Sequence, residues 1–269
     1  MKPEKTSPIG LFDSGVGGLT VASALRTLLP QEQLIYFGDT AHLPYGDKSK
    51  ETIIGYSLAI TAFLLEKGCK VILIACNSAS SNAFDEVKAF VGDRAEVLNV
   101  VDPVVDYAAK SYDISSIGVI GTKATIHSGT YEEKLREKRP GLKVSSLATP
   151  LFVPMIEEGF VFDDISNAII RSYLSRNELD EIDSLILGCT HYPIIKNQIS
   201  RFFNFEVNVI DSARIVAESV ASFLDENGLR ADKRTGPDRF FVSDHTPFFE
   251  VIAKMFFNEK IVLEKQSLG

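Results

Sequence analysis

Two cysteines of this chain follow apolar runs and precede polar residues, a placement that suits acid–base chemistry. Cys76 ends the run VILIAC, and Cys189 directly follows the run SLILG. Each thiol is expected at the carboxyl end of a strand and near the start of a helix, where unpaired backbone N–H groups and the helix dipole lower a cysteine pKa. The same N–H groups, with the side chains of Asn77, Ser78 and Thr190, could hold a carboxylate. The pattern therefore indicates two thiols that exchange protons with an anionic substrate.

Two equivalent thiols that face one cleft suit the inversion of a carbon that bears a hydrogen. One group must remove the proton and another must supply one on the opposite face, each from about 3–3.5 Å. The sulfurs would then lie roughly 7 Å apart across the substrate, too far for a relaxed disulfide. Because such a reaction is nearly symmetric, the two groups should be chemically alike and arranged pseudo-symmetrically.

Other polar residues stand at comparable strand ends. Asp13 and Ser14 lie in FDSGVGG after an early apolar run. Asp13 could accept a proton from the Cys76 thiol or from a substrate ammonium, although Asp or Ser at this place could simply cap a helix. His191 is the matching candidate beside Cys189, with a capping role as its alternative. The turn-rich loop GDTAHLPYGDKS (38–49) also follows a strand-like run, where a binding loop is expected.

The elements that must position these residues alternate between strand-like and helical patterns. Helices are expected over 19–29 and 52–68, and the second has the apolar spacing of an amphipathic helix. This alternation predicts doubly wound α/β domains with parallel sheets, and ligands bind such sheets at the carboxyl ends of the strands. The predicted strands are 8–13, 33–38, 70–75, 96–101, 116–121, 142–148, 184–188, 205–210 and 239–243.

Two pairs of internal matches indicate a duplicated α/β unit. SPIGLFDSG (7–15) resembles SSIGVIGTK (115–123), and KVILIACNSA (70–79) resembles DSLILGCTHY (183–192), at offsets of 108 and 113 residues. A single free cysteine is often only a buried core residue, but two at equivalent points of a repeat favour a shared function. We place the break near Asp102–Pro103 and expect the tail to complete the first domain. The predicted domains are 1–102 plus 211–269, and 103–210, with the active site between them.

Composition narrows the class of protein. The chain has 269 residues, of which 45% are apolar, enough for one large domain or two modest ones. Its net charge of -8 argues against a nucleic-acid partner, because that affinity comes mainly from neutralised phosphates. No apolar run approaches the about 20 residues of a membrane span.

The N-terminal residues and the cysteine count point to the cytoplasm. MKPEKTSPIG has no apolar core of the kind that secretory signals carry. Three cysteines are an odd number for a disulfide framework, so we expect free thiols in a reducing compartment. Cys69 lacks the polar neighbours of the other two cysteines and is predicted to be structural.

Five blocks of the sequence resemble glutamate racemase, a family within the aspartate/glutamate racemase superfamily. The similarity runs from about Ile9 to at least Ser212, and Ser78 stands where the family often has threonine. The blocks are IGLFDSGVGGLTV (9–21), YFGDTAHLPYG (36–46), ILIACNSAS (72–80), GVIGTKATIHSGTY (118–131) and LILGCTHYP (185–193).

The resemblance implies a reaction and a set of site residues. Cys76 and Cys189 would be the paired acid and base that convert L-glutamate to D-glutamate, and Asp13 and His191 would assist them. The segment PLFVPMIEEG (150–159) would add an acidic residue, which fits Glu157, with Glu158 as the alternative. The implied substrate contacts are Asp13, Ser14, Tyr45, Gly46, Asn77, Ser78, Thr190, His191 and Glu157.

The resemblance also implies two similar α/β domains, no pyridoxal phosphate, no metal and no other cofactor. The product would supply D-glutamate to bacterial peptidoglycan, and a cytoplasmic homodimer is expected. The rivals are an aspartate racemase or a one-cysteine decarboxylase of the same superfamily, a hydrolase that uses Cys76 with His191, and a zinc site from those two residues and Cys189. A two-domain protein that binds an amino acid without turnover is the non-enzymatic alternative.

Overall fold

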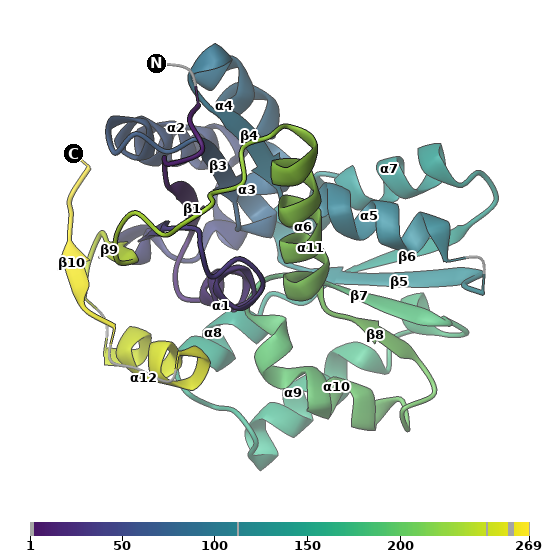
Figure 1. Cartoon of the computed structure of the whole chain (residues 1–269). Helices are drawn as coiled ribbons and strands as arrows, with labels where there is room; N and C mark the ends of the chain where they lie inside the picture. The colour runs from purple at the N-terminus through teal and green to yellow at the C-terminus, as the bar shows by residue number, and fades with distance from the viewer. Residues whose placement is uncertain (1–2, 112, 246, 258–260, 269) are drawn as a thin grey trace.

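The computed structural model describes residues 3–111, 113–245, 247–257 and 261–268, and it contains two parallel sheets covered by helices (Figure 1). The predicted class, two parallel-sheet α/β domains, is confirmed. All strand pairs within each sheet are parallel. Consequently the carboxyl ends of neighbouring strands meet along one edge of each sheet.

The first sheet has β1 at its centre, paired with β2 on one side and β3 on the other. The five residues of β1 and of β2 are all buried, as expected for strands covered on both faces. In spatial order the described strands are β10 (Leu263–Lys265), β9 (Arg239–Val242), β2 (Leu34–Gly38), β1 (Ile9–Asp13), β3 (Val71–Ile74) and β4 (Glu96–Asn99).

The second sheet repeats this arrangement on a smaller scale. Its central strand β5 pairs with β6 and β7, and β7 pairs with β8. In spatial order the described strands are β6 (Lys143–Ala148), β5 (Ser116–Gly121), β7 (Ser184–Gly188) and β8 (Asn208–Ile210). All nine predicted strands are present, most of them a residue or more shorter than predicted. The tenth strand, β10, has only three residues at the sheet edge and was not predicted.

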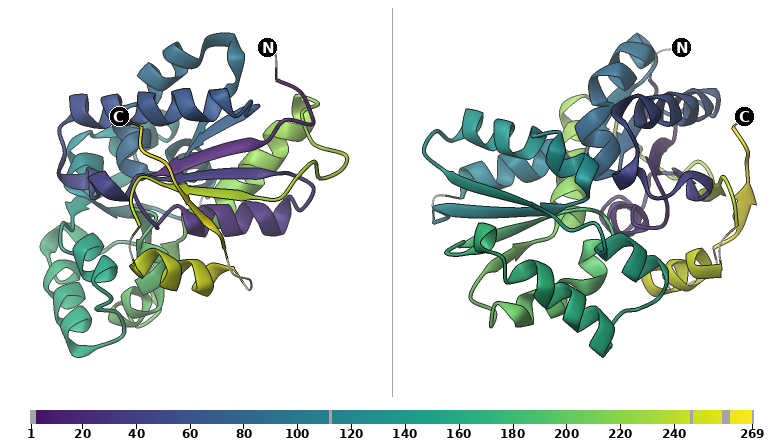
Figure 2. Two further views of the ribbon diagram at one scale, coloured as in Figure 1. Left: turned by 90° about the vertical axis from the view of Figure 1, so that its left-hand side faces the viewer. Right: turned by 180° about the vertical axis from the view of Figure 1, so that it is seen from behind.

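Alternate residues of each strand pack against helices on opposite faces of the sheet, because successive side chains of a strand point in opposite directions. On β3, Ile72 and Ile74 join the apolar cluster that includes α2 (Lys50–Glu66), whereas Val71 and Leu73 join the cluster that includes α1 (Leu19–Leu28). Two views turned from Figure 1 show these layers (Figure 2). The other α-helices of the described residues are α3 (Asn77–Asn82), α4 (Phe84–Val91), α5 (Val101–Lys110), α6 (Lys123–His127), α7 (Thr130–Lys138), α8 (Phe152–Glu157), α9 (Asp164–Leu174), α10 (Lys196–Phe202), α11 (Ser212–Glu226) and α12 (Pro247–Phe256).

The connection between the two sheets differs from the prediction. Asp102–Pro103 does not follow a strand directly but lies in the first turn of α5. Proline is tolerated there because the first helical N–H groups have no partner within the helix. The Asn99 side chain accepts hydrogen bonds from the backbone N–H groups of Val101 and Asp102, both at 2.9 Å, and so caps the helix. The division of the chain at residues 102 and 211 stays a prediction.

The C-terminal segment returns to the first sheet. After α11 packs against α1 and α5, the chain enters β9, which pairs with β2. The apolar cluster that contains α1 and α11 also includes residues of β7, so one continuous core links the two sheets. The edges of the two sheets are therefore held at a fixed separation by shared packing.

Cys69 has a buried thiol that is not among the predicted site residues. Its ionisation should make the stability of the fold depend on pH. Burial raises the pKa of its thiol to about 12. Below the ordinary cysteine pKa of about 8.5 the thiol is protonated in both states, so its contribution to stability is fully present. As the pH rises towards 12 only the unfolded chain ionises, so the unfolding free energy should fall by up to about 1.4 kcal/mol per pH unit. Urea unfolding at pH 8 to 11 should show a shallower fall for Cys69→Ala than for the wild-type chain. Equal slopes would contradict the assignment.

Candidate active site

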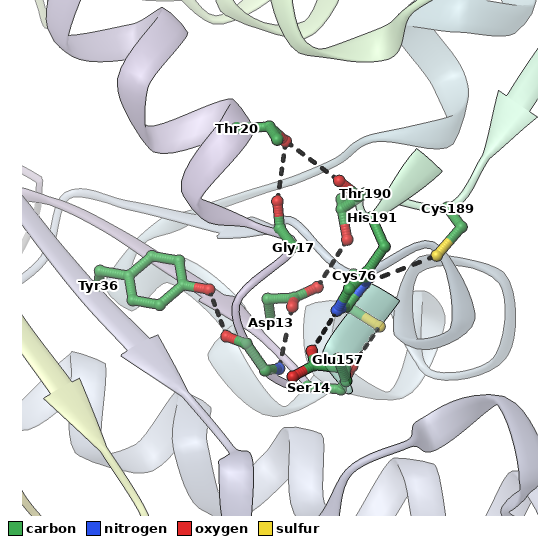
Figure 3. A network of polar contacts seen from close by, with 11 residues as sticks. Asp13, Ser14, Gly17, Thr20, Tyr36, Cys76, Glu157, Cys189, Thr190 and His191 are labelled. Atoms are coloured by element: carbon green, nitrogen blue, oxygen red, sulfur yellow. Dashed lines mark hydrogen bonds and ion pairs between the residues drawn. The ribbon is translucent and has the colours of Figure 1, made fainter. Parts of the chain in front are cut away.

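The predicted catalytic residues meet where three parallel strands end (Figure 3). Asp13 is the last residue of β1, Cys76 lies two residues after β3, and Cys189 directly follows β7. Their side chains are nearly inaccessible, since Asp13 is 0%, Cys76 4% and Cys189 6% exposed. Two strands of the first sheet and one of the second thus bring an acid and two thiols into one enclosed site.

Cys76 occupies the N-cap position of α3, as the sequence predicts. Its thiol donates to the Ser14 hydroxyl at 3.8 Å. The expected lowering of its pKa is wrong, however, because burial and then the charge of Asp13 raise the pKa of Cys76 to about 12. The Ala79 backbone N–H group and Ser14 oppose this shift but do not reverse it. In the closed site, loss of hydration and a nearby carboxylate therefore outweigh the start of a two-turn helix.

Cys189 has a different partner. Its sulfur lies 3.8 Å from Nδ1 of His191, and Nε2 of that ring lies 2.5 Å from Oε1 of Glu157. Burial lowers the pKa of His191, but the hydrogen bonds with Cys189 and Glu157 outweigh it and hold that pKa well above the usual range. A protonated imidazole beside a thiol favours the thiolate. The two thiols, although equivalent in the repeat, therefore have unlike electrostatic surroundings.

The helix expected near Cys189 begins as a 3₁₀ turn rather than as an α-helix. The chain forms a 3₁₀ turn over Tyr192–Ile195 before α10 begins at Lys196. Pro193 lies in this turn and has no backbone N–H group to donate. Cys189 therefore lacks a directly following α-helix of the kind that Cys76 caps.

Asp13 joins the two halves of the site. Its Oδ1 accepts from the Gly15 backbone N–H group at 2.9 Å, and its Oδ2 accepts from the Thr190 hydroxyl at 3.1 Å. The Thr20 hydroxyl adds a longer bond of 3.4 Å to the Thr190 carbonyl. The carboxylate beside Cys76 is thus fixed by a residue that follows Cys189 (Figure 3).

The glycine turn that precedes α1 allows this close approach. A Cβ atom added at Gly17 would lie 2.5 Å from both Nδ1 of His191 and Oγ1 of Thr190. We expect Gly17→Ala to lower the unfolding free energy by about 1–3 kcal/mol, because these buried side chains must move. Urea unfolding would measure this loss of stability, and an activity assay would show whether the displaced side chains serve the site. Gly55→Ala in α2 is the control, since nothing lies within 4 Å of its added Cβ, and it should stabilise the helix by about 0.5–1 kcal/mol. A Gly17→Ala protein as stable and active as the wild type would contradict the close approach.

Tyr45 and Gly46 lie in the 3₁₀ turn Tyr45–Asp47. The Tyr45 hydroxyl donates to Oδ2 of Asp39 at 2.5 Å, so its polar end is already engaged. A Cβ at Gly46 would lie 2.5 Å from Cβ of Thr122, across the boundary between the two sheets. Their predicted contact with substrate stays a prediction.

Asn77 and Ser78 differ in how many of their side-chain polar groups already have hydrogen-bond partners. Oδ1 of Asn77 accepts from the Tyr131 hydroxyl at 2.7 Å, which fixes the amide, whereas the buried Nδ2 group has no partner among the described residues. Such a buried N–H donor suits a ligand oxygen, because a buried donor without a hydrogen bond destabilises the folded protein. The Ser78 hydroxyl lies 2.8 Å from the Thr122 hydroxyl and 3.3 Å from that of Thr125.

Three further polar residues belong to this site and were not predicted from the sequence. Thr122, Thr125 and Tyr131 all lie in the block GVIGTKATIHSGTY, from which no site residue was selected. The internal repeat contains a signal for one of them, because the offset of 108 residues pairs Ser14 with Thr122. Thr125 and Tyr131 have no such counterpart and became visible only through their hydrogen bonds.

The predicted assisting residues are also brought together. Glu157 ends α8 and contacts His191, whereas the alternative, Glu158, caps the helix and has no such contact among the described interactions. Ser14 contacts Cys76, and Thr190 contacts Asp13. Within the described ranges, no group of three or more His, Cys, Asp and Glu side chains could hold a metal ion. No helix in those ranges is long and apolar enough to cross a membrane.

Comparison with known proteins gives a consistent result. The family model described as Asp/Glu/Hydantoin racemase matches residues 19–220. The chain is 42% identical to a glutamate racemase of Aquifex aeolicus over 94% of its own length and 95% of that protein. A crystal structure of glutamate racemase from Francisella tularensis in complex with D-glutamate is 39% identical, with a TM-score of 0.91 and 98% of each chain covered. Glutamate racemase isoform RacE1 of Bacillus anthracis is 34% identical, with a TM-score of 0.92 over 98% of this chain and 99% of that one.

Two parallel α/β domains with a buried thiol at a corresponding strand end of each define a two-domain racemase fold. The chain belongs to the Asp/Glu/Hydantoin racemase family, and within it to the glutamate racemases. The family resemblance drawn from the five sequence blocks is therefore confirmed, as is the enzymatic class. The roles of individual site residues stay predictions.

Proposed function

We propose that this enzyme interconverts L- and D-glutamate by moving the Cα proton between Cys76 and Cys189, without a cofactor. The observation that carries the proposal is the pair of buried thiols at equivalent strand ends, each in contact with its own polar partner, Ser14 or His191. One thiolate takes the Cα proton, and the opposite thiol gives its proton to the other face of the carbon. The sulfur that began as thiolate ends as thiol, and the other ends as thiolate, so protons and charge balance.

The surroundings of the two thiols suggest which of them donates a proton and which accepts one when the reaction starts. The raised pKa of Cys76 keeps it a neutral thiol near pH 7 and thus a proton donor. The hydrogen bonds of His191 with Cys189 and Glu157 raise the pKa of its ring, which would place an imidazolium beside the Cys189 sulfur. The first proton would then pass from substrate to Cys189 in one direction of the reaction. In the other direction, Cys76 must first pass its proton to the Asp13 carboxylate beside it, and Cys189 must take a proton from the His191 imidazolium. Cys76 then removes the Cα proton as thiolate, and Cys189 returns a proton as thiol.

The free donors and hydroxyls suit the two ends of glutamate. Nδ2 of Asn77 and the backbone N–H groups around Cys76 can receive a carboxylate and delocalise the charge that develops at Cα. Asp13 can balance the substrate ammonium. The hydroxyls of Ser78 and Thr122 form a polar group of suitable chemistry for the second carboxylate. Enclosure of the thiols excludes water, which strengthens these interactions in the transition state.

We further propose that the product supplies D-glutamate for peptidoglycan, and that the enzyme works in the cytoplasm as a homodimer. The family membership supports the metabolic role. The three free, buried cysteines suit a reducing compartment. Sedimentation of the purified chain would test the dimer directly.

The test of the reaction is incubation with L-glutamate in D2O, without pyridoxal phosphate or metal. The circular dichroism of the amino acid and the deuterium content of Cα are followed together. Loss of optical activity with one deuterium in the product supports cofactor-independent proton transfer. Turnover of aspartate instead of glutamate would overturn the substrate, and activity only after added pyridoxal phosphate would overturn the mechanism.

A further inference from the structure

A hollow of about 540 Å³ lies beside the cleft and is bordered by cationic side chains. Lys48 and Lys50 come from the end of the Tyr45–Asp47 turn and the start of α2, and Lys123 comes from α6 of the second domain. His127, on α6, also lines the hollow. We name this feature the lysine hollow, defined by Lys48, Lys50, Lys123 and His127.

Two carboxylates, one of which lines the hollow, neutralise the positive charge of the lysine hollow only in part. Lys123 pairs with Asp47 at 3.1 Å, and Lys50 approaches Glu86 only to 3.8 Å. No ion pair of Lys48 is found within the described part of the chain. The hollow is therefore a locally positive region on a protein whose net charge is -8.

The lysine hollow adjoins the polar end of the site. Gly46 lines the hollow and also contacts Thr122, whose hydroxyl bonds that of Ser78. Asn82, which lines the hollow too, donates to the carbonyls of Ser78 at 2.9 Å and of Ala124 at 3.1 Å. Gly46 and Asn82 therefore connect the lining of the hollow to Thr122 and Ser78.

We propose that the lysine hollow is the approach route of the substrate anion and raises its local concentration by electrostatic attraction. The inference rests on the proposed function, since glutamate carries a net charge of about -1 at neutral pH from the ordinary pKa values of its groups. Such an anion meets repulsion from a protein of charge -8 at long range. A cluster of like charges beside a cleft focuses the field and can raise association rates by about 10- to 1000-fold. The hollow thereby offsets the unfavourable overall charge.

The test reverses the charge of Lys48 and Lys50, the two lysines that do not take part in the Asp47–Lys123 pair. Lys48→Glu/Lys50→Glu should lower kcat/KM for L-glutamate about tenfold at an ionic strength of about 0.02 M, with kcat unchanged. The loss should vanish near about 0.5 M salt, where screening shortens the reach of charges to a few ångströms. Lys233→Glu/Lys254→Glu is the matched control, because it changes the net charge equally on surfaces that do not line the hollow.

The outcomes separate this inference from the proposed function. A loss that is equal in the control, equal at every salt concentration, or confined to kcat would overturn the steering role. Lys48→Gln, a milder change, should give a smaller loss of kcat/KM with the same salt dependence. A Lys48→Gln enzyme with an unchanged kcat/KM at low salt would also contradict the inference. A wild-type chain that does not racemise glutamate would refute the proposed function instead, and that measurement is made first.

Discussion

Cys76→Ala and Cys189→Ala will each lower the rate of glutamate racemisation by at least about 10³-fold, because one face of Cα then lacks its acid–base group. The loss must be equal in the L-to-D and D-to-L directions. The two enantiomers have equal free energies in solution, so the ratio of the two kcat/KM values is fixed. Polarimetry from either enantiomer would measure both rates.

Deuterium exchange distinguishes loss of a base from loss of the fold. With one thiol left, a variant can still remove the Cα proton of one enantiomer and return a deuteron to the same face. We expect this exchange to be faster in Cys76→Ala, which keeps the Cys189–His191 pair, than in Cys189→Ala, which keeps a thiol with a pKa of about 12. Cys69→Ala is the control, because its thiol lies outside the cleft, and it should racemise within a few-fold of the wild type. A single active-site variant that still inverts glutamate at a near normal rate would exclude the two-thiol mechanism.

Much of the fold could be predicted from sequence because its signals are local. Each buried parallel strand is a short apolar run, and each run ends in polar or glycine residues at the edge where ligands bind. The internal repeat then relates β3 and Cys76 to β7 and Cys189. The short β10, by contrast, has one apolar residue among three at a sheet edge, and its pairing with β9 comes from the return of the chain tail.

The sequence indicated which strand ends would bring polar residues together, but it did not indicate the electrostatics of the site. A strand end followed by a helix suggested lowered thiol pKa values, yet burial and Asp13 raise the pKa of Cys76. Burial depends on how tightly the two domains close, and no local pattern encodes that. The contact of Asp13 with Thr190, residues 177 positions apart in the chain, is equally invisible to spacing.

Asp13→Asn will lower kcat by about 10²–10³-fold while making Cys76 more acidic. The substitution keeps the size of the side chain and one acceptor for the Gly15 N–H group, and the Thr190 hydroxyl can reverse its role to accept from the new amide. The negative charge is lost, so one cause of the raised pKa of Cys76 disappears and that pKa should fall. Alkylation of Cys76 by iodoacetamide at pH 9, followed by mass spectrometry, should therefore be faster than in the wild type.

The expected fall in kcat and the expected rise in Cys76 reactivity distinguish three roles for Asp13. If Asp13 served only to hold the turn, a variant with its hydrogen bonds intact would keep its rate. If thiol acidity limited the reaction, a more acidic Cys76 would speed it. A slower enzyme with a more reactive Cys76 instead identifies the carboxylate as a participant that receives a proton or balances the substrate ammonium, a role general acid–base groups perform at about this magnitude. Unchanged alkylation together with unchanged kcat would remove Asp13 from the mechanism and leave it as the link between the Gly15 turn and Thr190.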